Sequence, residues 1–120
     1  MVAPTRAEDL DAGREAHGLA LALYRATRDF PDAERYGLTS QMRRAAVSVP
    51  ANIAEGFRRR GLADKIRFYN TAEGSLEELK YHLLLSRDLA HLAADSPLRA
   101  HADTVGRLLN GLIASTERRK

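Results

Sequence analysis

The sequence predicts an all-α protein, an antiparallel up-and-down four-helix bundle. Apolar residues recur at spacings of three and four in four separate stretches, which is the periodicity of one face of a helix. Proline and glycine residues separate these stretches, and such short connections favour antiparallel neighbours. The chain has 120 residues, of which 44% are hydrophobic and none is cysteine, so it can form one core without disulfides. We therefore expect a single domain over 1–120, with flexible ends at about 1–8 and 118–120.

The first helix is expected over 9–29 and is followed by a turn. Its apolar stripe consists of Ala16, Leu19, Leu23, Ala26 and Phe30. Pro31 ends the helix because proline disfavours the α conformation for the residue before it. The segment 32–37 is then expected to be a turn, whose final glycine can adopt a positive φ.

The second helix is expected over 39–60, with a kink near Pro50. Thr39 or Ser40 can serve as its N-cap, and its main apolar stripe consists of Met42, Ala46, Val49, Ile53 and Phe57. Proline inside a helix removes one backbone donor and costs on the order of 3 kcal/mol. The helix therefore either kinks at Pro50, or ends there and restarts with Pro50 as the first residue of a new helix.

The same helix has a second apolar face, formed by Val47, Ala51 and Ala54. These residues lie more than a quarter turn from the main stripe. A helix that is apolar on two sides is expected to be covered on two sides. We therefore predict that Val47, Ala51 and Ala54 form an interface between copies of the chain.

The third helix is expected over 62–93 and the fourth over 97–117. Leucines in the C-terminal half of the third helix point in nearly every direction, so neighbours are expected to enclose it. Gly74 costs this helix roughly 0.5–1 kcal/mol relative to alanine, which predicts the close approach of another backbone there. Ser96 and Pro97 supply a cap and a first residue for the fourth helix. The expected core of the bundle includes Leu23, Ile53, Leu76, Leu83, Val105 and Leu109.

The sequence contains no recognisable catalytic or metal-binding motif. The histidines lie singly on predicted helices, without a nucleophile elbow or triad motif, at His17, His82, His91 and His101. The pairs Asp88 with His91 and Glu78 with His82 fall short of the two Glu-x-x-His helices of a di-iron bundle. We expect no enzymatic activity, no metal and no cofactor.

We expect no secretory signal, because the N-terminal residues contain no apolar h-region. We also expect no membrane span, because no stretch approaches the roughly 18 apolar residues that a span needs. A cytoplasmic location without a membrane partner is the expectation.

Basic residues cluster within and just after the second helix. The net charge of +3 is modest, but Arg44 and Arg58 lie opposite the core stripe, and guanidinium groups bind phosphate oxygens bidentately. The predicted nucleic-acid-binding residues are Arg43, Arg44, Arg58, Arg59, Arg60, Lys65 and Arg67, with a further basic cluster at Arg118, Arg119 and Lys120. This set predicts contact with the RNA or DNA backbone, without reading of bases. The alternative is a structural scaffold whose basic patch docks an acidic protein partner.

The remaining polar, glycine and aromatic residues of this region are assigned structural roles. Asn52 and Glu55 are expected to satisfy helix ends or to pair with neighbouring arginines, Arg44, Arg58 or Arg59. Gly56 and Gly61 flank three arginines and are expected to end the second helix. Base stacking is expected to be weak, because packing roles are assigned to the aromatic residues Tyr36, Phe57 and Tyr69.

Four segments together resemble a known family. They are Phe30-Pro31 through Glu34, the run from Tyr36 to Ala46 (YGLTSQMRRAA), the run from Ser48 to Gly56 (SVPANIAEG), and the segment from Arg67 to Leu79. The family consists of bacterial four-helix bundle proteins encoded within intervening sequences of 23S rRNA genes, also called S23 ribosomal proteins. The resemblance implies this fold for most of the chain and a ring-shaped homopentamer. It also implies that Asn52 and Glu55 occupy invariant positions.

A more distant branch of that family includes the accessory variability determinant of diversity-generating retroelements. That protein is basic and works with a reverse transcriptase and nucleic acid, so the resemblance implies partners of those two kinds. The first helix departs from the family because relatives often carry a tryptophan there and this chain has none.

Overall fold

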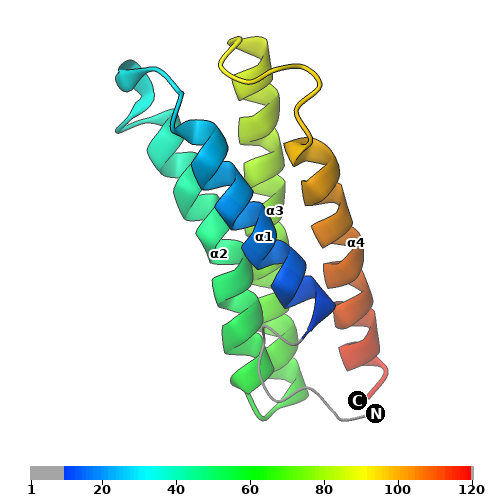
Figure 1. Cartoon of the computed structure of the whole chain (residues 1–120). Helices are drawn as coiled ribbons and strands as arrows, with labels where there is room; N and C mark the ends of the chain where they lie inside the picture. Colours follow the sequence, from blue (N-terminus) through cyan, green and yellow to red (C-terminus); the bar gives the residue numbers. More distant parts are fainter. Residues whose placement is uncertain (1–9, 120) are drawn as a thin grey trace.

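The computed structural model describes residues 10–119, which fold into four α-helices joined by short connections (Figure 1). The helices are α1 (Asp11–Thr27), α2 (Leu38–Arg58), α3 (Leu62–Asp88) and α4 (Leu98–Glu117), with one 3₁₀ turn, η2 (Asp32–Glu34), before α2. The described residues contain no β-strand, so the prediction of an all-α four-helix bundle is confirmed. None of these helices is both long and apolar enough to cross a membrane.

Each helix packs against two neighbours, since α1 and α3 both contact α2 and both contact α4. Figure 1 shows consecutive helices running in alternate directions along the bundle. The α2–α3 connection and the C-terminal end of α4 therefore lie at one end of the bundle. The connections between α1 and α2 and between α3 and α4 lie at the other end.

Buried apolar side chains from all four helices form one cluster. The six residues predicted for the core are each at most 3% exposed, which confirms that prediction: Leu23, Ile53, Leu76, Leu83, Val105 and Leu109. The apolar stripes therefore identified the inner face of each helix correctly.

Helix α2 continues through Pro50 without interruption, so the alternative in which a new helix starts at Pro50 is wrong. Side chains beside the proline add hydrogen bonds in the turn where the backbone lacks a donor. Asn52 Nδ2 donates to the Ser48 carbonyl at 2.8 Å, and the Ser48 and Ser75 hydroxyls are 2.7 Å apart, which joins α2 to α3. The sequence had suggested that Asn52 caps a helix end or pairs with an arginine. In the structure it does neither and bonds to Ser48 instead.

The boundaries of α2 differ from the predicted ones. The N-cap is Gly37, so neither Thr39 nor Ser40 caps the helix. Gly37 has a φ of −113° and does not use the positive φ that glycine allows. At the other end the backbone becomes extended at Arg59, while Gly56 lies within the helix and Gly61 precedes α3. The prediction that Gly56 helps to end α2 is wrong.

Helix α3 ends at Asp88, five residues earlier than predicted, in a Schellman motif. Ala90 adopts the left-handed conformation (φ 62°), the His91 N–H donates to the Ser86 carbonyl at 2.9 Å, and the Ala90 N–H donates to the Arg87 carbonyl at 3.0 Å. Glycine normally occupies the left-handed position of this motif. Because alanine occupies it here, no residue type in this segment signals the end of the helix.

The leucines near the end of α3 are only partly covered within one chain, since Leu84 is 38% exposed and Leu89, which follows the helix, is 48% exposed. At the start of α4, Ser96 Oγ accepts a hydrogen bond from the Leu98 N–H at 3.4 Å, although the helix begins one residue later than expected.

Close packing at a glycine occurs at Gly56, whereas it had been predicted at Gly74. A Cβ atom added to Gly56 would lie 2.6 Å from Tyr69 Cε1 and 3.1 Å from the Lys65 carbonyl oxygen. A Cβ added to Gly74 would have no such neighbour within 4 Å, and Gly74 is exposed. The prediction for Gly74 is therefore wrong, and Gly56 lets the end of α2 approach α3.

We expect Gly56→Ala to lower the free energy of unfolding by about 1–3 kcal/mol, because the added methyl group must displace the buried Tyr69 ring or the α3 backbone. Gly74→Ala is the matched control and should raise it by about 0.5–1 kcal/mol, since alanine is the better helix former. Urea denaturation followed by circular dichroism measures both values. Equal effects of the two substitutions would contradict the packing described here.

Candidate functional site

Basic side chains gather at the end of the bundle where α2 gives way to α3. This surface, the basic end, comprises Arg58, Arg59, Arg60, Lys65, Arg67, Arg118 and Arg119, and all of these except Lys65 are exposed. Arg118 and Arg119 follow α4, whose C-terminal end lies beside the α2–α3 connection (Figure 1). The fold thus joins two basic clusters that are far apart in the sequence. Lys120 and residues 1–8, also predicted to be flexible, lie outside the described residues.

The ring of Phe68 makes cation–π contacts with two of these arginines. The guanidinium carbons of Arg59 and Arg67 lie 4.8 and 4.6 Å from the centre of its ring. Arg59 also pairs with Glu55 at 3.0 Å, and Arg67 lies 3.6 Å from Asp64. Cation–π contacts at exposed sites contribute about 0.5–1 kcal/mol, so they restrict how these two side chains move. Three arginines were proposed as partners of Glu55, and in the structure its partner is Arg59.

Lys65 is engaged within the protein. Its ammonium donates to the Phe57 carbonyl at 2.7 Å and to the Gly56 carbonyl at 3.4 Å, which satisfies acceptors at the end of α2. Burial lowers the pKa of Lys65, and the nearby charge of Arg119 lowers it further. Lys65 therefore holds α2 to α3, and its contact with phosphate stays a prediction.

Arg43 and Arg44 lie apart from the basic end. They precede Arg58 by four turns of α2, roughly 20 Å along the helix at about 1.5 Å per residue. Arg43 Nε donates to Thr27 Oγ1 at 3.0 Å, and its guanidinium carbon lies 4.6 Å from the centre of the Tyr24 ring, so it joins α2 to α1. Arg44 is exposed. The structure therefore divides the seven predicted contact residues between two surfaces.

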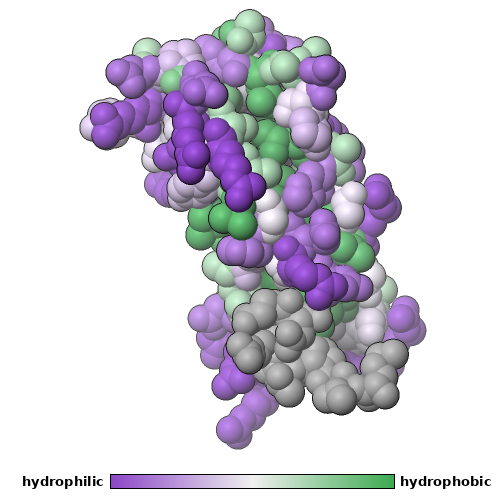
Figure 2. All heavy atoms as spheres, in the orientation of Figure 1, coloured by the Kyte–Doolittle hydropathy of each residue, from purple (hydrophilic) through white to green (hydrophobic). Residues whose placement is uncertain are grey.

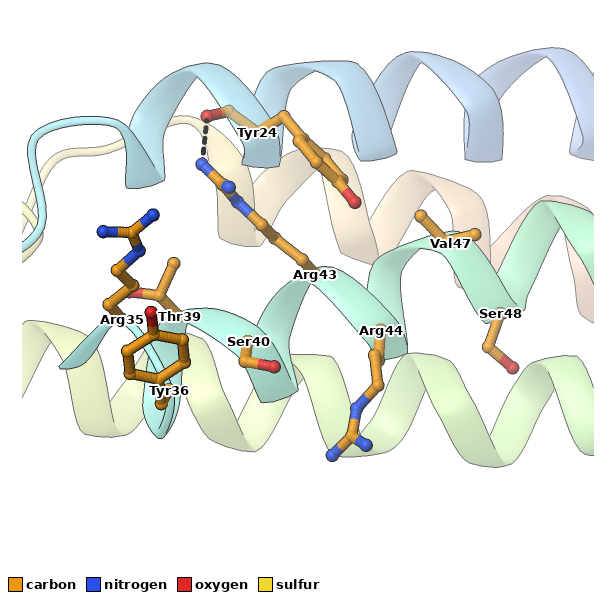
Figure 3. A pocket seen from close by; sticks show the side chains of 9 residues that line it. All are labelled: Tyr24, Arg35, Tyr36, Thr39, Ser40, Arg43, Arg44, Val47 and Ser48. Atoms are coloured by element: carbon orange, nitrogen blue, oxygen red, sulfur yellow. Dashed lines mark hydrogen bonds between the residues drawn. The ribbon is translucent and has the colours of Figure 1, made fainter.

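The second surface is a groove of about 570 Å³ where α1, the turn after η2 and the first half of α2 meet. Figure 3 shows the side chains that line it: Tyr24, Arg35, Tyr36, Thr39, Ser40, Arg43, Arg44, Val47 and Ser48. We call this surface the tyrosine groove. Tyr36 is 87% exposed, so the prediction that it packs inside the protein is wrong, whereas Tyr69 is buried as predicted. Tyr36 stands alone between polar residues and glycine, and no periodic pattern around it indicates whether it is buried.

The outer face of α2 is not covered within one chain. Val47 is 44% exposed, Ala51 is exposed and Ala54 is partly buried. On α1, Leu21 is 43% exposed. Figure 2 shows apolar patches between hydrophilic side chains on the face of the bundle that it presents.

Histidines pair with glutamates across the fold. His91 Nε2 lies 2.9 Å from Glu34 Oε2 and joins the end of α3 to η2, while His101 lies 3.3 Å from Glu15 and joins α4 to α1. Sequence spacing could not reveal either pair, because the partners are far apart along the chain. In the part of the chain that the structure describes, no three potential metal ligands come together. These pairs act as ties between helices.

Comparison with known proteins supplies the family. The model of the 23S rRNA-intervening sequence protein family matches residues 8–111. A crystal structure from Bacteroides thetaiotaomicron, described as a protein of unknown function from the S23 ribosomal protein family, superposes with a TM-score of 0.79 at 19% identity. The match covers 86% of this chain and 95% of that one. No curated protein matches the sequence. The fold and the family match agree, and this chain belongs to the 23S rRNA-intervening sequence protein family.

Proposed function

We propose that this protein is a non-enzymatic, oligomeric accessory protein that binds the phosphate backbone of RNA or DNA through its basic end. The observation that carries the proposal is the exposure of Arg58 and Arg60 at that end. Among the described residues, no carboxylate lies within salt-bridge distance of either guanidinium group, whereas Glu55 and Asp64 pair with Arg59 and Arg67. Guanidinium groups without an internal partner are free to bind phosphate oxygens bidentately.

Other positive charges surround Arg58 and Arg60 and strengthen the positive electrostatic field at the basic end. Arg59 and Arg67 are stacked on Phe68, so their charges stay close to the surface. Arg119 lies near enough to Lys65 to lower the pKa of its ammonium group. Like charges in one place repel one another, and an anionic strand relieves that repulsion. The family is named after an intervening sequence of 23S rRNA, which makes RNA the first strand to test.

Self-association is part of this proposal. The face formed by Val47, Ala51 and Ala54 is open to solvent in one chain, and a second copy of the chain is the partner that would cover it. A pentamer, as the family resemblance implies, would repeat the basic end around an axis and multiply its affinity for a strand. Light scattering after size exclusion measures the number of chains directly, and a monomer at micromolar concentration would refute this part.

The experiment that tests nucleic-acid binding is a salt titration followed by fluorescence anisotropy, with labelled RNA and DNA oligonucleotides. We expect the logarithm of the association constant to fall linearly with the logarithm of salt concentration. The slope should be about −0.7 to −0.9 for each phosphate that the protein neutralises, because each neutralised phosphate releases a counterion. Polyglutamate of the same charge is the competitor. Absence of binding at low salt to both nucleic acids would reject the proposal, and stronger binding of polyglutamate would favour a scaffold that docks an acidic protein.

A further inference from the structure

The exposed ring of Tyr36 is held in place. The turn that carries it is closed by backbone hydrogen bonds from the Arg35 N–H to Asp32 (3.0 Å) and from the Gly37 N–H to Glu34 (3.1 Å). The guanidinium carbon of Arg35 lies 5.5 Å from the centre of the Tyr36 ring. Since the ring is 87% exposed, it keeps a free surface on an ordered turn. A free aromatic surface beside a cation is suited to stacking on a planar ligand.

The rest of the tyrosine groove favours a negative charge. Arginines 35, 43 and 44 line it, and no acidic side chain belongs to the lining. Arg43 is fixed by hydrogen bonds to neutral oxygens of Thr27 and Tyr24, so its positive charge stays in the wall of the groove. In the described residues none of these arginines pairs with a carboxylate. Helix α2 also begins beside the groove without a side-chain cap, which adds its positive end to this field.

The positions of these groups match one chemical unit. Figure 3 shows Tyr36 and Arg44 on the same side of α2, with the Ser40 hydroxyl between them. An aromatic ring, a hydroxyl donor and a guanidinium group in this order fit a base, a sugar and a phosphate. The volume of about 570 Å³ falls within the usual range for small-ligand sites, which is about 300–1,000 Å³.

We propose that the tyrosine groove binds one unpaired nucleotide of a nucleic-acid strand, with the base stacked on Tyr36 and the phosphate held by Arg44. This inference rests on the proposed function and extends it, because it replaces the expectation of weak stacking with a preference for unpaired bases. Bases within a duplex stack on one another and cannot reach Tyr36. The protein should therefore prefer single strands to duplexes that carry equal charge.

The test compares an unstructured single strand with a duplex of equal charge, by anisotropy at moderate salt. Tyr36→Leu should weaken single-strand binding about fivefold or more, the lower bound of what one stacked base contributes, and should change duplex binding less than twofold. Tyr36→Phe keeps the ring and should bind like the parent. Tyr81→Leu is the matched control because Tyr81 is 61% exposed on α3, away from the groove, and it should have no effect.

An abasic strand provides the second arm, because it keeps the phosphates and lacks the bases. If Tyr36 stacks on a base, the parent should bind this strand as weakly as Tyr36→Leu binds the complete strand. Tyr36→Leu should then bind the abasic strand little more weakly than the parent does, because the stacking contact is already lost. Single strands that bind no better than duplexes, with Tyr36→Leu equal to the parent, would overturn this inference and leave backbone binding at the basic end intact. A change in oligomeric state on Tyr36→Leu would also overturn it, by showing that the groove is a contact between copies.

Discussion

Leu76→Ala should lower the free energy of unfolding by about 2–5 kcal/mol. Leu76 lies in the middle of α3 and is 1% exposed. Its Cδ2 atom lies 3.5 Å from the position that a Cβ would occupy on Gly106 of α4, so the side chain fills the space that this glycine leaves between the two helices. Truncation removes buried methyl groups and leaves a cavity that rigid helices cannot fully close.

This loss is large for a small domain, whose total stability is commonly about 5–15 kcal/mol. Leu84→Ala is the matched control because it makes the same change on the same helix at a position that is 38% exposed. It should cost less than half as much, since much of its side chain is already in contact with water. Chemical denaturation of both variants gives the two values. Similar losses would mean that Leu84 is buried in an assembly that one chain does not show.

The helical faces were predictable from sequence because burial imposes a period on them. Leu23, Ile53 and Leu109 come from three different helices, and each was assigned to the core from spacings of three and four residues. The ends of helices were less predictable, because they depend on single residues. Ala90 ends α3 in a left-handed conformation that its residue type disfavours by about 1–2 kcal/mol, so contacts around the turn must compensate for it.

Which glycine allows close packing could not be predicted from the sequence, because it depends on contacts between helices. Gly74 and Gly56 both interrupt apolar helical patterns, and sequence alone assigned close packing to the first. In the structure the ring of Tyr69 lies over Gly56. Tyr69 is thirteen residues away on the next helix, so its position follows from the angle at which α2 and α3 meet. No local pattern contains that angle.

The sequence indicated which basic residues are exposed, but it did not indicate how they are divided between two surfaces. Arg58 and Arg60 are exposed as expected, yet Arg43 lies four turns away on the same helix and is bound to Tyr24 of α1. Arg119 joins the basic end from the far end of the chain. The length of α2 was predicted almost correctly, so the separation of Arg43 from Arg58 could have been worked out. The contribution of Arg119 required the packing of α4.

The control for the basic end removes the same amount of positive charge from another part of the surface. Arg87, Arg99 and Arg107 are exposed on α3 and α4, and two of them pair with nearby acids, Asp88 and Asp103. Replacing these three arginines with alanine removes as much positive charge as replacing Arg58, Arg59 and Arg60. Any effect of net charge alone on nucleic-acid binding should therefore be equal in the two triple variants.

Replacing Arg58, Arg59 and Arg60 with alanine should weaken binding to every RNA and DNA sequence by about tenfold or more, since each charge-assisted hydrogen bond to phosphate contributes roughly 1.5–3 kcal/mol. The slope of the logarithm of affinity against the logarithm of salt should become shallower by about 0.7–0.9 for each phosphate that the variant no longer neutralises. Stability should change little, because the contacts of Arg59 that this variant removes, the ion pair with Glu55 and the cation–π contact with Phe68, lie at the surface. Anisotropy across a salt series measures affinity and slope, and light scattering checks that the variant and the parent have the same number of chains per particle. If this variant binds as well as the Arg87, Arg99 and Arg107 variant, with the same slope, then the basic end does not contact the strand.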